Sequence, residues 1–243
     1  MHTKIGPDWE PDRAELLAGL REFALLMRGA PIRNEHGLRG GSAFALWWFL
    51  RALKPTIVFE VGVWRGFSTW LIEQAAPTAD IHCFDPLFFL QPWMSRWKVG
   101  RVYRSARARY WTDEFSCASI SSIVAAHERP VVFFDDHQNK LPRLHQARAA
   151  GFREIIFDDN MAKAGTHVSL EDLRGEPDGR ALLQREVEAY EIFPALWPAE
   201  FHAPGLDIVE EGLGFPVEPA FEVLHRDRNF YSSVTRVSLR ADA

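Results

Sequence analysis

The sequence predicts an α/β fold in which parallel strands alternate with helices. A buried-strand pattern runs into a glycine turn and a helix start within residues 57–69. Further along, strand and helix patterns alternate over residues 131–135, 141–150 and 154–158. Such alternation is typical of βαβ units, which form parallel sheets. The length of 243 residues suits one α/β domain with a large core.

Two helices are predicted ahead of the first strand. Residues 11–27 repeat apolar side chains at the spacing of one helix face, namely Leu16, Leu20, Phe23 and Met27. A polar loop with several glycines follows, and a second, more apolar helix is predicted over residues 43–53. We therefore expect residues 1–54 to form a helical extension whose loop lies where it can cover a ligand.

Residues 57–69 have the features of a cofactor-binding turn. Gly62 and Gly66 interrupt the pattern directly after the first strand, so the backbone there can approach a ligand closely. Ser68 and Thr69 then open the helix. The sequence therefore predicts a small-molecule site at the end of the first strand.

A second strand, predicted over residues 80–85, ends in Asp85, whose carboxylate can accept both hydroxyls of a ribose. Nicotinamide dinucleotides and S-adenosylmethionine both present a ribose to such an acid. A dinucleotide fingerprint needs G-x-G-x-x-G, but Trp64 stands where its second glycine would be. Glu60 would repel a pyrophosphate and attract the ammonium and sulfonium of S-adenosylmethionine. These residues favour the methyl donor.

At EVGVWRG (Glu60 to Gly66) and CFDP (around Asp85) the chain resembles the class I S-adenosylmethionine-dependent methyltransferases. The resemblance implies a Rossmann-like, doubly wound, seven-stranded, mostly parallel sheet. It also implies that Glu60 lies near the methionine part of the cofactor, which Gly62 and Gly66 line. Asp85 would hold the ribose, and Asp113 in YWTDEFS is the candidate for the adenine side.

The remaining elements complete the predicted domain. Residues 102–104 are expected to form a short third strand and residues 116–127 a helix, within a cofactor-binding core of residues 55–160. Residues 161–218 carry Gly and Pro repeatedly and are expected to form a cap or insertion with one helix at 179–192. Two strand-like runs around the polar turn 226–229 predict a terminal antiparallel hairpin over residues 219–243.

Two acidic doublets follow the predicted fourth and fifth strands. VVFFDDHQ contains Asp135 and Asp136, and EIIFDDN contains Asp158 and Asp159. Because neighbouring parallel strands end at the ligand-binding edge, these carboxylates are expected to converge and repel one another. Protonation, cationic side chains or a divalent cation would relieve the repulsion, and each doublet alone also suits an ordinary helix cap. We favour Mg²⁺, which binds hard oxygen ligands and leaves positions for substrate hydroxyls.

The doublets look like those of the metal-dependent macrocin-type O-methyltransferases, and the fuller segments resemble an uncharacterised branch near them. That resemblance implies Mg²⁺ ligands at Asp136, Asp158 and Asp159. The chain reads FFDDHQN where those enzymes tend to read D-G-D, so Asp135 is an alternative to Asp136. His137 beside Asp136 is the candidate general base, because its ordinary pKa lies near neutrality. It suits a second role as a capping residue equally well.

Composition narrows the class of protein. The chain is 47% hydrophobic and 25% charged with a net charge of −5, which is ordinary for a globular protein and gives no nucleic-acid footprint. It shows no signal-peptide pattern or membrane span, and its two cysteines lack a metal-like spacing, so we expect a reduced, cytoplasmic setting. H-E-x-x-H, G-x-S-x-G and Walker motifs are missing from the sequence, which disfavours zinc-protease, hydrolase and NTPase activities.

Together these features predict an S-adenosylmethionine-dependent, Mg²⁺-assisted O-methyltransferase. Its acceptor would be a hydroxyl of a small molecule, such as a sugar or a natural-product intermediate, with the protein acting mainly by positioning the two reactants. We expect no nucleic-acid or membrane partner and leave a homo-oligomer open. The alternatives are an NAD(P)-dependent oxidoreductase and a non-catalytic cofactor-binding protein of the same fold.

Overall fold

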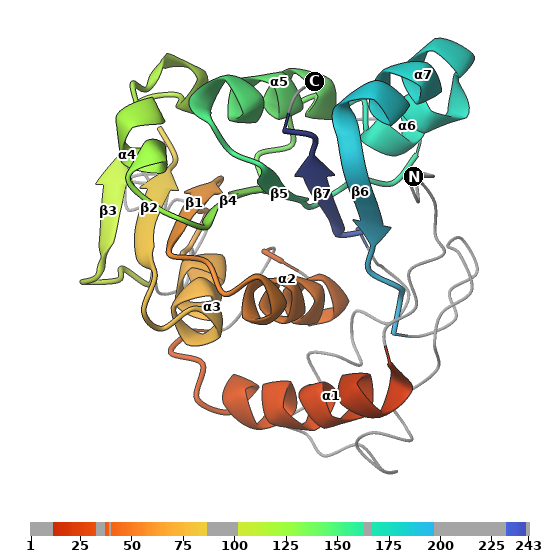
Figure 1. Cartoon of the computed structure of the whole chain (residues 1–243). Coiled ribbons are helices and arrows are strands. Elements are labelled where there is room, and N and C mark those ends of the chain that lie inside the picture. The colour runs from red at the N-terminus through yellow and green to blue at the C-terminus, as the bar shows by residue number, and fades with distance from the viewer. Residues whose placement is uncertain are drawn as a thin grey trace, which may run out of the picture.

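The computed structural model describes residues 12–32, 37–38, 40–86, 102–162, 167–196 and 232–241. Its seven strands are β1 (Ile57–Val61), β2 (Asp80–Phe84), β3 (Ala108–Trp111), β4 (Pro130–Phe134), β5 (Glu154–Phe157), β6 (Val187–Ile192) and β7 (Thr235–Leu239). They form one sheet in the order β3-β2-β1-β4-β5-β7-β6 (Figure 1). The first five strands are parallel, and β7 runs antiparallel to both β5 and β6.

The predicted Rossmann-like fold is confirmed by this strand order. The run 3-2-1-4-5 is the doubly wound order, in which the chain reverses direction across the sheet at β1 and β4. The second of the two strand-like runs predicted near the end of the chain contains β7, which runs antiparallel to β5 and to β6, a strand that lies before residues 219–243 in the sequence. The turn predicted at 226–229 and the strand-like run before it lie outside the described residues.

Helices cover both faces of the sheet (Figure 1). One face carries α1 (Arg13–Met27), α2 (Gly40–Leu53) and α3 (Phe67–Ala75). The other carries α4 (Ser121–Ala125), α5 (Lys140–Ala150), α6 (Leu170–Gly175) and α7 (Pro177–Glu186). Successive strand residues therefore alternate between two apolar cores, and every residue of β1 is buried.

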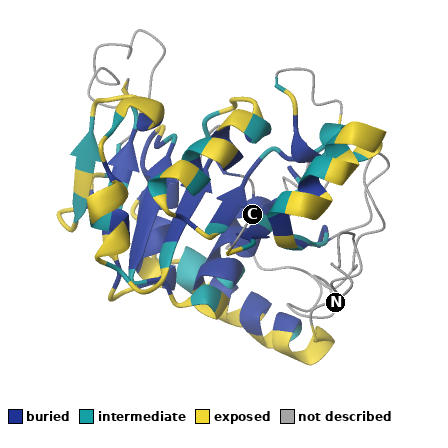
Figure 2. Cartoon of the chain, turned by 45° about the horizontal axis from the view of Figure 1, so that its top comes forward, coloured by how far each residue is buried: buried dark blue, intermediate teal, exposed yellow. Residues whose placement is uncertain are grey.

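The two predicted N-terminal helices are confirmed. Asp12 caps α1 by accepting a hydrogen bond from the backbone N–H of Glu15 at 2.9 Å. The predicted apolar stripe, with Leu16, Leu20 and Phe23 buried, faces α2, and the opposite side of α1 is exposed (Figure 2). α2 is buried nearly all round because it lies between α1 and the sheet, as its apolar sequence requires.

Three predicted elements differ from the structure. The helix expected at 179–192 ends at Glu186, and the remaining residues form β6. The third strand is β3 rather than residues 102–104, because the backbone N–H of Tyr103 donates to the carbonyl of Arg65 at 2.8 Å instead of joining a strand ladder. The helix expected at 116–127 is shorter, with the 3-10 turn η3 (Phe115–Cys117) before α4.

Pairing with β7 explains why residues 187–192 are a strand. Their sequence, VEAYEI, contains strong helix formers, but Val187 and Tyr190 are both buried against the sheet and the segment pairs with β7 along its length. Tertiary contacts therefore override the local helix preference.

Among the residues that the structure describes, no helix is both long and apolar enough to cross a membrane.

Candidate functional site

The turn between β1 and α3 requires glycine at two positions. Gly62 and Gly66 have φ values of 94° and 83°, in the left-handed region. A Cβ atom on Gly62 would lie 2.3 Å from the carbonyl oxygen of Asp135, and one on Gly66 would lie 2.2 Å from that of Tyr103. The turn is therefore packed directly against the end of β4 and against the segment that contains Tyr103.

Glu60 is buried at the start of this turn. Its Oε2 atom accepts hydrogen bonds from Thr69 Oγ1 at 2.5 Å and from Cys83 Sγ at 3.2 Å, and its Oε1 atom has no hydrogen-bond partner among the described residues. Burial raises the pKa of Glu60 to about 7, against the opposing effect of the side chains of Ser68, Thr69 and Cys83. Ser68 and Thr69 are buried in the first turn of α3.

Asp85, the residue that follows β2, is hydrogen-bonded to the turn. Its Oδ2 atom accepts hydrogen bonds from the backbone N–H groups of Val63 and Trp64, both at 3.2 Å. The structure thus brings Asp85 and the glycine turn together, as predicted from two separate sequence segments. Asp113 lies two residues beyond β3 and is exposed.

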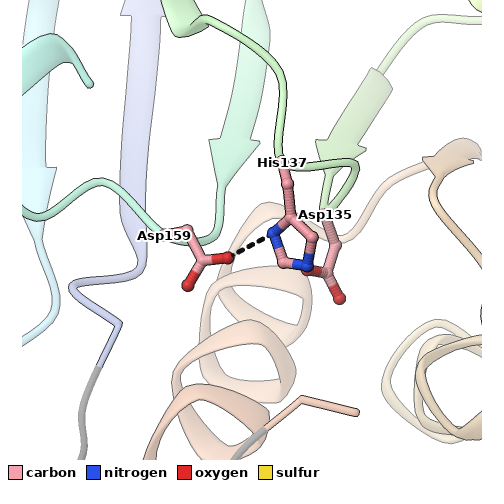
Figure 3. A group of neighbouring side chains, drawn as sticks. All are labelled: Asp135, His137 and Asp159. Atoms are coloured by element: carbon pink, nitrogen blue, oxygen red, sulfur yellow. Dashed lines mark ion pairs between the residues drawn. The ribbon is translucent and has the colours of Figure 1, made fainter. Parts of the chain in front are cut away.

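The ends of β4 and β5 bring three potential metal ligands together. One ligand atom each from Asp135, His137 and Asp159 lies within 4.8 Å of the others (Figure 3). His137 Nδ1 and Asp159 Oδ2 are 2.6 Å apart, and the His137 side chain is 65% exposed. We call these three residues the acid cluster. The sequence predicted Asp159 as a metal ligand, Asp135 as the alternative to Asp136, and His137 as the general base; the predicted ligand Asp158 is not one of the three.

Asp136 lies apart from the acid cluster. Its Oδ2 atom accepts a hydrogen bond from Arg143 Nε at 2.7 Å, and Arg143 also binds Glu114, with Nη2 at 2.8 Å from Oε1. Asp135 directly follows β4 and continues its alternation toward the α1–α3 side, whereas the hydrogen bond from Arg143 holds Asp136 on the α5 side. The predicted ligand Asp136 is instead an ion-pair partner of α5.

Replacing Arg143 with methionine is expected to lower the free energy of unfolding by about 2–3 kcal/mol. The side chain is 5% exposed, so its loss leaves Asp136 with an unpaired charge at a buried position. Urea unfolding monitored by circular dichroism measures the change. Arg51→Met removes the exposed Arg51–Glu22 ion pair and should change stability by less than about 1 kcal/mol. Equal losses in the two variants would contradict the prediction.

Asp158 is hydrogen-bonded to the segment that leads into β7. It accepts a hydrogen bond from the hydroxyl of Ser232, which also contacts the hydroxyl of Ser42 on α2. Burial raises the pKa of Asp158 to about 6, with the neighbouring charge of Asp159 adding to the effect. No sequence pattern indicated Ser42 or Ser232, because they reach Asp158 only through the fold.

The acid cluster has an uneven distribution of charge. Burial, together with the charges of Asp158 and Asp159, raises the pKa of Asp135 well above its usual range. Burial would also raise the pKa of Asp159, but the hydrogen bond from His137 lowers it below its usual value. The same hydrogen bond raises the pKa of His137. His137 and Asp159 therefore form a coupled pair in which Asp159 carries the negative charge.

The backbone is strained at both members of this pair. His137 and Asp159 have φ values of 53° and 51°, in the left-handed region where His and Asp occur more often than most residues. Strained backbone of this kind clusters at functional sites, where the surrounding structure holds it in place. The two strained residues directly face each other across the ends of β4 and β5 (Figure 3).

No family model matches the chain, and no curated protein matches it. It is similar to the SAH-bound methyltransferase PaMTH1 of Podospora anserina, with 13% identity over 95% of this chain and 89% of that chain and a TM-score of 0.40. It is also similar to an O-methyltransferase from Bacillus cereus in complex with SAH, with 14% identity, coverage of 69% and 76%, and a TM-score of 0.39.

A third similar structure is the O-methyltransferase TomG from Streptomyces achromogenes, involved in tomaymycin synthesis and solved in complex with SAM. It shares 15% identity over 75% of this chain and 78% of that chain, with a TM-score of 0.38. All three are methyltransferases, the class that the sequence resembles. At these identities and TM-scores the fold is assigned from the strand order and not from the similarity.

Proposed function

We propose that the protein is an S-adenosylmethionine-dependent O-methyltransferase that methylates a hydroxyl group of a small molecule. The observation that supports it is the contact between its two candidate half-sites. Gly62, in the turn proposed to bind the methyl donor, packs against the backbone of Asp135, the first residue of the acid cluster. A donor on the turn and an acceptor at the cluster would therefore be neighbours, as methyl transfer requires.

The residues around the turn fit the proposed donor. The unpartnered Oε1 atom of buried Glu60 offers an acceptor to the ammonium of the methionine part, and such an atom is costly to leave unsatisfied. Gly62 and Gly66 have no side chains, so a ligand can approach the backbone of the turn closely. Asp85 would hold the ribose, with Asp113 nearer the adenine. In its ionised form Glu60 would also oppose the pyrophosphate that the alternative, an NAD(P)-dependent oxidoreductase, would bind.

His137 is the proposed general base. Its Nδ1 atom bonds Asp159, so its Nε2 atom is left to accept the proton of the acceptor hydroxyl as the new O–CH₃ bond forms. The exposed side chain can be reached by a substrate from solvent. Asp159 is a positioning residue in this scheme, because it fixes the orientation and tautomer of the imidazole.

Mg²⁺ fits the carboxylates of the cluster better than the imidazole, because it prefers oxygen ligands. Asp135 and Asp159 would hold it, with Asp158 next to them and Asp136 engaged with Arg143. When bound, Mg²⁺ would make the acceptor hydroxyl easier to deprotonate. We therefore place the acceptor hydroxyl, from a sugar or a natural-product intermediate, at the acid cluster.

Calorimetry with S-adenosylhomocysteine tests the proposed function, with NAD as the control ligand. We expect binding of the thioether with a dissociation constant on the order of micromolar and no heat with NAD. Binding of NAD without the thioether would overturn the proposal in favour of the oxidoreductase. Thioether binding without methylation of any hydroxylated acceptor would favour the non-catalytic alternative.

The affinity for S-adenosylhomocysteine is expected to be about eightfold weaker at pH 6 than at pH 7.5. The pKa of Glu60 is raised to about 7 in the free protein, so the carboxyl is mostly protonated at pH 6 and must lose that proton to pair with the ligand ammonium. Calorimetry at both pH values measures the ratio. Glu60→Gln should bind weakly with little pH dependence, and an unchanged ratio in that variant would assign the proton to another group.

A further inference from the structure

A buried lysine begins the helix that follows β4 and His137 along the chain. Lys140 is the first residue of α5, and it is fully buried. Its Nζ atom has no hydrogen-bond partner among the described residues and lies 5.9 Å from the centre of the Phe157 ring. A buried ammonium without hydrogen bonds is unfavourable unless nearby negative charge compensates it.

The compensating charge comes from the ends of β4 and β5. Burial lowers the pKa of Lys140, while Asp136, Asp158, Asp159 and Asp135 act in the opposite direction and favour its charged form. Asp136 already pairs with Arg143, and Asp159 with His137. Asp136 acts most strongly on Lys140. Asp135 and Asp158 form no ion pair among the described residues, and Lys140 favours the charged form of both.

The backbone holds Lys140 in this position. Its N–H donates to the carbonyl of Val168 at 3.0 Å, and the N–H of Val168 donates to the side chain of Asn139 at 2.8 Å. These two hydrogen bonds fix the start of α5 against the segment before α6. The ammonium is therefore a fixed part of the site and not a mobile surface charge.

We propose that Lys140 is the built-in counter-cation of the acid cluster and that it limits the affinity of this cluster for divalent cations. Its fixed positive charge repels a cation bound by Asp135 and Asp159 and already supplies part of the neutralisation that the cation would give. The inference rests on the proposed role of the acid cluster. It makes the unmodified site a weak cation site.

Binding of Mn²⁺ tests the proposal without any need for turnover, because carboxylates bind Mn²⁺ as they bind Mg²⁺. Free Mn²⁺ is measured by electron paramagnetic resonance at pH 8 in the wild type, Lys140→Met and Lys140→Arg. We expect Lys140→Met to bind Mn²⁺ about tenfold more tightly or better, since it loses the charge but keeps the aliphatic stem. Lys140→Arg keeps the charge and should bind like the wild type.

A second variant locates the effect. Adding Asp135→Asn to Lys140→Met should remove the gain in affinity, and Lys140→Gln should reproduce it if Lys140→Met does not fold. Equal Mn²⁺ affinity in the wild type and the neutral variants, including no binding in either, would overturn the proposal. So would a gain in Lys140→Arg, because the charge would then not be the cause.

The outcome is separable from that of the proposed function. S-adenosylhomocysteine affinity, measured in the same variants, should not change, because Lys140 lies at the cluster and not at the glycine turn. A gain in Mn²⁺ affinity without thioether binding would support the proposed role of Lys140 and contradict the proposed methyltransferase function. Thioether binding with no change in Mn²⁺ affinity would contradict only the proposed role of Lys140.

Discussion

Replacing Gly62 with alanine is expected to abolish cofactor binding and to lower the free energy of unfolding by about 4 kcal/mol. An alanine there must adopt a φ of 94°, which L side chains disfavour by about 1–2 kcal/mol. Its Cβ would also lie 2.3 Å from the carbonyl oxygen of Asp135, so either the turn or the end of β4 has to move. Both movements distort the proposed donor site.

Calorimetry with S-adenosylhomocysteine and urea unfolding measure the two effects. Gly175→Ala is the matched control, because a Cβ at Gly175 meets no atom within 4 Å and the residue is helical. That variant should retain cofactor affinity and be unchanged or slightly more stable. A Gly62→Ala protein with normal stability and normal thioether affinity would show that the turn does not hold the donor.

Replacing His137 with asparagine is expected to lower kcat for methyl transfer by about 10²–10⁴-fold with unchanged affinity for S-adenosylhomocysteine. Asparagine tolerates the left-handed backbone at this position but cannot accept the hydroxyl proton as imidazole does. His145→Asn is the control, since His145 is an exposed histidine on α5 that pairs with Glu186. Its activity should stay at the wild-type level.

The pH dependence of kcat distinguishes a base from a merely structural histidine. A base must be neutral, and the pKa of His137 is raised by its hydrogen bond to Asp159, so wild-type activity should increase with pH through a midpoint above 6.5. Asp159→Asn removes that negative charge, so its midpoint should move to lower pH and its kcat should fall. A midpoint that does not move in Asp159→Asn would rule out His137 as the titrating base.

Much of the donor half-site was predictable because its signals are local. Gly62 and Gly66 follow a continuous apolar strand and precede a helix start, so the sequence itself marks the turn that both residues form with positive φ. Asp85 was placed by its position at the end of the next strand. Short-range spacing and the known geometry of parallel sheets were sufficient for these three residues.

The acceptor half-site was less predictable because it depends on register and on distant contacts. Asp135 and Asp136 are adjacent in sequence, and a one-residue difference in where β4 ends decides which of them faces the cluster. Nothing in the local sequence marks Lys140 or Arg143, at the start of the helix predicted over residues 141–150, because the acidic residues that act on them lie outside that helix. β6 read as helix because its pairing partner, β7, begins more than forty residues later.

The place of β7 in the sheet sets an order for folding. Ile155 of β5 pairs with Val237 of β7, and the same β7 residue pairs with Tyr190 of β6. Until residues 235–239 are available, the sheet remains open between β5 and β6, and each of those strands has an unpaired edge. Such edges promote aggregation, and closing them requires contacts between residues far apart in sequence, which slows folding. β7, the last of the seven strands to be synthesised, joins β5 to β6 and brings Ser232 to Asp158 beside the acid cluster.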